Sequence, residues 1–123
     1  RIPMHCSSVG KVILAHLSDE EISRIVASRS LTGKTANTIT DLAELKRHLG
    51  IVRRKGYAVD DEENEKGIRC VAAPVLNESG KVVAAVSISG PTVRLTMNQI
   101  QKTLSGKVRE TAMKISRELG FNK

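Results

Sequence analysis

The chain has 123 residues, enough for one hydrophobic core and too few for two, so a single domain is expected. Its formal charge is +7, but aromatic residues make up only 2% of the sequence, which argues against single-stranded nucleic acid because bases would have few rings on which to stack. No apolar run approaches the ~20 residues that span a bilayer. The two cysteines form no framework of the secreted kind, so a cytoplasmic location is predicted.

The charge is distributed unevenly. Five of the 13 acidic residues lie in the segment Asp60–Glu65, so the rest of the chain carries a formal charge of +12 once those five negative charges are removed from the total of +7. The basic residues are scattered over all the predicted helices, so direct nucleic-acid binding remains only an alternative interpretation. The chain begins at Arg1 rather than Met, and residues 1–5 resemble mid-chain coil, which indicates a piece of a longer protein.

Two short helices are predicted first. Ser7 and Ser8 precede the apolar run Val9–Leu17, and serine is a favoured N-cap residue. The sequence from Ser18 to Glu21 has the S-x-x-E pattern of a capping box, so a second helix is expected to follow directly.

A third helix is predicted after a loop. The stretch Ser30–Thr40 is rich in Ser and Thr and is expected to be a loop, with at most a short strand. Asp41 is the predicted N-cap of the next helix, and Gly56 is its predicted end. The apolar positions between them keep helical spacing: Leu42, Leu45, Leu49 and Val52.

Three strands follow, at residues 57–60, 68–76 and 82–89. The turn at 77–80 has hairpin length, so the last two strands are expected to pair in antiparallel fashion. Pro74 cannot donate a hydrogen bond and should lie at a strand end, a bulge or an unpaired edge.

The last strand places polar side chains on one of its two faces. Ser87 and Ser89 lie about 7 Å apart on the same side. If they are buried, either a polar ligand or the neighbouring backbone must satisfy them, and the strand alone does not decide between the two. At period two, one face holds Val82, Ala84, Val86 and Ile88, and the other holds Val83, Ala85, Ser87 and Ser89.

A long helix closes the chain. Thr96 with Gln99 is expected to open it and Gly120 to end it. Its apolar stripe is assigned to the core, with part of it available to an oligomer interface: Met97, Ile100, Leu104, Val108, Ala112, Ile115 and Leu119. Helices, then strands, then a helix that covers the sheet indicate an α+β fold.

Several separated blocks together resemble one protein family. They are HCSSVGKVILA (His5–Ala15), Leu42–Gly56, GYAVDDEENEKGIRCVAAPV and VSISGP. In this order they resemble the effector-binding domain of the IclR family of bacterial transcriptional regulators. The resemblance implies a GAF-like or profilin-like antiparallel sheet flanked by helices, without a cofactor or a metal. It also implies a homodimer or homotetramer, DNA binding by a separate N-terminal winged helix-turn-helix that this chain lacks, and an effector domain whose first segment is missing here.

The resemblance also implies an effector pocket. Its groups would be the backbone N–H groups of Ser8 and Val9 with the side chains of Asp60, Cys70, Ser87 and Ser89. A helix start favours a carboxylate, serine hydroxyls can donate to it, and an ionised aspartate accepts from a ligand hydroxyl. A small monocarboxylate with a hydroxyl or keto group, such as a 2-oxo acid or sugar acid, is therefore the expected partner. Members of the family often have small residues where this chain has Ser8 and Val9, so the Val9 side chain narrows the site or faces the core.

Two other chemistries use residues of the same kinds. Cys70 would be a nucleophile if His5 were its base and Asp60 oriented the base, but a cysteine in an apolar strand is usually a core residue and no hydrolase motif surrounds it. His5, Cys6, Asp60 and Cys70 are zinc ligands in kind, but their spacing matches no recognised zinc pattern. The acidic segment 60–65 lacks the ligand spacing of an EF-hand loop and is expected to be a turn with structural hydrogen bonds.

Overall fold

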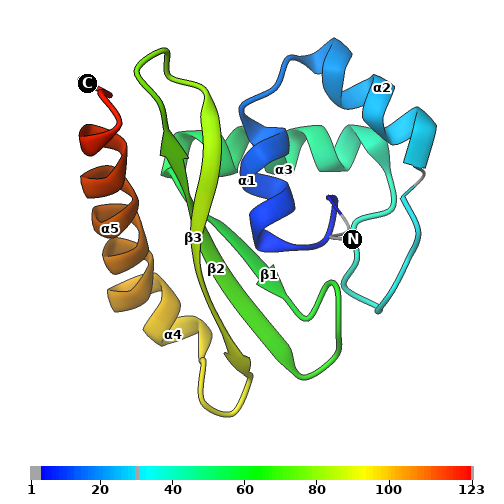
Figure 1. Ribbon diagram of the computed structural model, residues 1–123. Helices are drawn as coiled ribbons and strands as arrows, with labels where there is room; N and C mark the ends of the chain where they lie inside the picture. Colours follow the sequence, from blue (N-terminus) through cyan, green and yellow to red (C-terminus); the bar gives the residue numbers. More distant parts are fainter. Residues whose placement is uncertain (1–3, 30, 123) are drawn as a thin grey trace.

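A three-stranded antiparallel sheet separates two layers of helices in the computed structural model, which describes residues 4–29 and 31–122 (Figure 1). The strands are β1 (Ala58–Asp61), β2 (Ile68–Leu76) and β3 (Val82–Pro91), in the order β1-β2-β3. One face carries α1 (Ser8–Ala15) and α3 (Leu42–Lys55), and α2 (Asp19–Arg29) packs against α3 on the outside of this layer. The other is covered by α4 (Met97–Gln99), the π-helical turn η1 (Ile100–Leu104) and α5 (Ser105–Glu118). The α+β prediction is confirmed.

The helix starts follow local hydrogen-bonding rules. Ser7, not Ser8, is the N-cap of α1, because its side chain accepts from the N–H of Gly10 at 3.0 Å. Ser18 and Glu21 form the predicted capping box, with both hydrogen bonds at 3.1 Å. Helix α1 ends at Ala15, two residues earlier than predicted.

The third helix and the loop before it also follow the prediction. Asp41 caps α3, and Gly56 ends it with a left-handed φ of 82°. Residues 31–40 contain no strand. The predicted coil at residues 1–5 and the predicted loop from Ser30 include residues 1–3 and 30, which lie outside the described residues.

The strand register determines the positions of two residues, Pro74 and Val82. Pro74 pairs with Ala85 of β3 but lies beyond the part of β2 that pairs with β1, so on that side it lies at an unpaired edge, as predicted. A register shift between Val75 and Leu76 makes Val82 the partner of Leu76. The predicted face of Val82 is therefore wrong: it packs with Ala85 against α1 and α3, because the bulge changes the alternation at this point.

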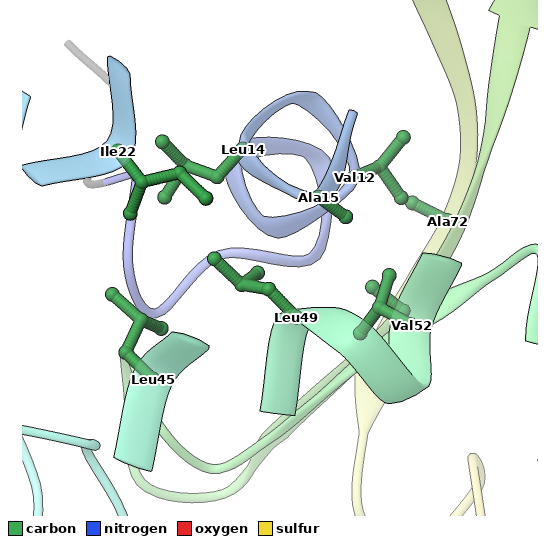
Figure 2. Close-up of a cluster of buried hydrophobic side chains, with 9 residues drawn as sticks. Val12, Leu14, Ala15, Ile22, Leu45, Leu49, Val52 and Ala72 are labelled. Carbon is green, nitrogen blue, oxygen red and sulfur yellow. The ribbon is translucent and has the colours of Figure 1, made fainter. Parts of the chain in front are cut away.

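Each face of the sheet has its own hydrophobic core. Figure 2 shows the first, in which α1, α2 and α3 pack together over Ala72 of β2. The second lies between β2 and the C-terminal helices and includes Val71, Ala73, Ile100, Val108 and Ala112. The two cores together fix which face of each strand meets which helix layer.

The C-terminal helix departs from the predicted stripe. Thr96 and Gln99 form the expected capping box, but the helix then passes through the π-helical turn η1. Ile100, Val108 and Ala112 are buried as predicted. Towards the end of α5 the buried position is Ser116, whereas Ile115 and Leu119 are 37% and 45% exposed instead of lying in the core.

Candidate functional site

Three strands place polar residues in one row across the sheet. Asp60 of β1 lies opposite Cys70 of β2, and Cys70 lies opposite Ser89 of β3. Directly opposed residues of antiparallel strands point to the same face, and Ser87 shares that face two residues along β3. This polar row, Asp60, Cys70 and Ser89, lies on the α1 side of the sheet.

The start of α1 lies against this row. Ser8 is buried, and its hydroxyl donates a hydrogen bond of 2.7 Å to the sulfur of Cys70. The helix's own hydrogen-bond ladder does not use the N–H groups of Ser8 and Val9, which belong to its first turn. The Val9 side chain packs against the first hydrophobic core, so it faces the core rather than narrowing the site. The predicted site residues therefore converge from one helix and three strands.

Cys70 is a neutral thiol in this setting. Burial is the main reason that its pKa is raised above the ordinary value, and the nearby charge of Asp60 adds to this. The hydroxyls of Ser8, Ser89 and Ser87 interact with the sulfur and oppose the shift. A thiol with a raised pKa is a poor nucleophile, which disfavours covalent chemistry here.

The structure does not bring a base to Cys70. The Nε2 atom of His5 lies 2.8 Å from the backbone oxygen of Thr32, in the loop before α3. Among the described residues Asp60 makes no hydrogen bond to that imidazole, and its Oδ1 atom accepts from the acidic turn instead. The triad of His5, Cys70 and Asp60 is therefore not assembled. Within residues 4–29 and 31–122, no group of three His, Cys, Asp or Glu residues is arranged to hold a metal ion.

Asp60 has a structural role as well as its place in the row. Its Oδ1 atom accepts from the N–H of Glu63 at 2.8 Å and of Asn64 at 3.3 Å. Asp60 as a residue is 4% exposed, and burial raises its pKa although the two N–H groups favour the ionised form. In the same turn, Glu62 accepts from the N–H of Gly67 at 2.9 Å, so the acidic segment is a turn with structural hydrogen bonds, as predicted.

The loop before α3 supports this turn from outside. The side chain of Asn37 donates to the carbonyl of Asp61 at 2.9 Å. Thr35 and Thr38 donate to the next two carbonyls, those of Glu62 and Glu63. Three successive carbonyls of the acidic turn therefore have partners in one loop, which fixes the turn that carries Asp60.

The exposure of Ser87 and Ser89 differs from the expectation of buried hydroxyls. Both residues are exposed, because β3 is an edge strand of the described sheet. They lie on the same face as Cys70, and because they are exposed their hydroxyls do not need a partner inside the fold. The structure therefore leaves them available to a ligand without requiring one.

Sequence reasoning missed a buried charged pair beside the row. Lys11 of α1 is completely buried and forms an ion pair with Glu63 of the acidic turn. The available signal was a single lysine within the apolar helix SVGKVILA, six of whose residues are buried. A charge at such a position needs a buried partner.

Comparison with known proteins agrees with this architecture. Residues 1–117 match the model of the bacterial transcriptional regulator IclR C-terminal domain. The chain belongs to the IclR family. The described residues contain no helix that is long and apolar enough to cross a membrane.

Relatives of this IclR domain are named as regulators. The transcriptional repressor AllR of Salmonella typhimurium is 42% identical over 121 residues, which are 98% of this chain and 44% of AllR. The chain thus spans less than half the length of this curated relative.

Solved structures share the fold. Thermotoga maritima IclR is 42% identical with a TM-score of 0.89, over 98% of this chain and 48% of that one. The inducer-binding domain of the transcription factor PobR from Acinetobacter, a double mutant in complex with 3-hydroxybenzoic acid, is 32% identical with a TM-score of 0.89, over 94% of this chain and 66% of that one.

Proposed function

We propose that this IclR domain senses a small monocarboxylate with a hydroxyl or keto group, within a transcriptional regulator. The observation that carries the proposal is the convergence of Ser8 with the polar row Asp60, Cys70 and Ser89. The complex of PobR with 3-hydroxybenzoic acid supports it, because that ligand is also a monocarboxylate with a hydroxyl group.

Each residue has a role that suits this ligand. The N–H groups of Ser8 and Val9 and the hydroxyls of Ser87 and Ser89 bind the carboxylate. Asp60 accepts from the ligand hydroxyl through the carboxylate edge that the acidic turn does not use. Cys70 packs against the ligand as a neutral thiol.

Thermal unfolding of the longer protein that contains this chain tests the proposal. The panel is glyoxylate, pyruvate, gluconate and 3-hydroxybenzoate, with glucose as the neutral control. An acid at about 100 times its dissociation constant adds about 2.7 kcal/mol of stability, which gives a shift of several degrees. No shift with any acid would contradict the proposal.

Serine variants assign the binding to this site. Ser87→Ala or Ser89→Ala is expected to weaken binding about tenfold to a hundredfold, because each loses a hydrogen bond to a charged group worth about 1.5 to 3 kcal/mol. Ser79→Ala, in the exposed β2–β3 turn, is the matched control and should bind normally. Equal affinities in all three variants would place the ligand elsewhere.

We further propose that the segment before this chain in the longer protein covers the free edge of β3. The strand Val82–Gly90 carries no charge that would protect an edge, and the match covers only 66% of the PobR domain. Amides on the outer side of β3 should exchange slowly with solvent in the longer protein. Rapid exchange would show that the edge stays open.

We assign DNA recognition to a separate N-terminal domain of the longer protein. The longer protein is predicted to be a cytoplasmic homodimer or homotetramer. The present chain should therefore fail to retain a specific operator at physiological salt, and its basic surface should give only weak, salt-sensitive binding. Specific retention in competition with random DNA would favour direct nucleic-acid binding instead. Light scattering of the longer protein checks the oligomer.

A further inference from the structure

Lys11 has an unusual position for a lysine. It lies in α1, three residues after Ser8 and therefore on the same side of the helix, and its exposure is 0%. Lysine is almost never fully buried unless it is paired. A buried ammonium at this point needs partners for its charge and its hydrogen bonds.

The partners of Lys11 belong to the elements that carry the site. Its Nζ atom donates to the backbone oxygen of Val59 at 2.8 Å, directly before Asp60 in β1. The same ammonium pairs with the carboxylate of Glu63, whose side chain is 9% exposed. Lys11 therefore joins the helix that presents the amides to the strand and turn that present Asp60.

The connection continues from Glu63 into the site. The other carboxylate oxygen of Glu63 accepts from the N–H of Asp61 at 3.1 Å. The backbone N–H of Glu63 donates to Oδ1 of Asp60 at 2.8 Å. A displacement of Glu63 would therefore change the position of the Asp60 carboxylate. The start of α1 is consequently held over the sheet at two points, Ser8 on Cys70 and Lys11 on the acidic turn.

We propose that Lys11 is a positioning residue of the effector site, which fixes the N–H groups of Ser8 and Val9 relative to Asp60. This inference rests on the proposed function and goes beyond it, because Lys11 is completely buried and acts on the site through its contacts with Val59 and Glu63. Its ion pair with Glu63 determines the distance between the group that binds the ligand carboxylate and the group that binds the ligand hydroxyl.

Charge and position can be separated by a double substitution. Lys11, Glu63 and Asp60 together carry one net negative charge when all three are ionised. The variant Lys11→Met/Glu63→Gln keeps that net charge but removes the ion pair. The single variant Lys11→Met leaves Glu63 buried without its cation and is expected to unfold more easily.

The experiment compares these variants in the longer protein. Titrations with glyoxylate, pyruvate, gluconate and 3-hydroxybenzoate measure affinity, and thermal unfolding measures stability. The double variant should regain most of the stability lost in Lys11→Met but bind its acid at least tenfold more weakly than the unmodified protein. Without ligand, its amide resonances of Ser8 and Val9 should shift, which reports the changed helix position directly.

The matched control removes a different lysine–carboxylate ion pair. Lys46 and Asp19 are 3.9 Å apart, with side-chain exposures of 27% and 82%, and they join α3 to α2 away from the row. Lys46→Met/Asp19→Asn should leave the affinity and the resonances of Ser8 and Val9 unchanged.

The outcomes distinguish the two proposals. A Lys11→Met/Glu63→Gln variant with normal affinity, or with unmoved resonances of Ser8 and Val9, overturns the positioning role alone. If the unmodified protein binds none of the four acids, the proposed function fails, and the positioning role fails with it.

Discussion

Substitution by alanine should destabilise the domain at Gly10 and stabilise it at Gly50. A Cβ atom on Gly10, in the first turn of α1, would lie 2.6 Å from both the Cα and the carbonyl oxygen of Met4, and 2.7 Å from Oγ of Ser7. Two of these contacts are with backbone, which cannot rotate away. A Cβ atom on Gly50, within α3, would meet nothing within 4 Å.

The expected magnitudes follow from these distances. Gly10→Ala gains about 1 kcal/mol of helix propensity, but overpacking costs about 1 to 3 kcal/mol and disturbance of the Ser7 cap about 0.5 to 2 kcal/mol. A net loss of about 2 kcal/mol is expected. Gly50→Ala should gain about 0.5 to 1 kcal/mol, because it is exposed and unobstructed.

Urea unfolding of the longer protein, followed by hydrogen exchange of peptides from this domain, measures both changes. Gly10→Ala should lower the urea midpoint of this domain and Gly50→Ala should raise it. Gly10→Ala should also weaken effector binding, because the contact with Met4 displaces the start of α1. A Gly10→Ala domain as stable as Gly50→Ala would refute the steric argument.

Three further predictions concern single side chains. Ser116→Ala should destabilise the fold by about 1 to 3 kcal/mol, because the buried hydroxyl accepts from the N–H of Leu76 at 2.8 Å, and an unchanged urea midpoint would contradict this. Burial lowers the pKa of His48 to about 4, so the unfolded state binds a proton first and stability should fall as the pH drops from about 6.5 to 4. The full pKa shift corresponds to about 3.4 kcal/mol of stability, which partial solvent screening reduces to about 1 to 2 kcal/mol. The variant His48→Gln should remove this pH dependence from the urea midpoints, and a variant that retains it would contradict the assignment. Asp60→Asn should preserve the fold, because an amide oxygen can still accept from the N–H of Glu63, but competition titrations should show a changed preference among hydroxy and keto acids rather than a loss of carboxylate binding.

The sequence by itself determined the features that depend on near neighbours. The caps at Ser18 and Asp41, the left-handed end of α3 at Gly56 and the β2–β3 hairpin all follow from contacts within a few residues. Each was predicted because a local hydrogen bond or a backbone angle decides it. The quoted motif blocks likewise indicated the family, which the match over residues 1–117 confirms.

Only the tertiary structure decided how distant segments meet. The alignment of Asp60, Cys70 and Ser89 depends on the register of three strands, which alternation within one strand does not specify. The contact between Lys11 and Val59 joins residues 48 positions apart, so no local pattern encodes it. The exposure of Ser87 and Ser89 likewise follows from the position of β3 at the edge of the described sheet. Sequence pattern determines the direction of a side chain along its own element, whereas burial and partners depend on the packing of other elements against it.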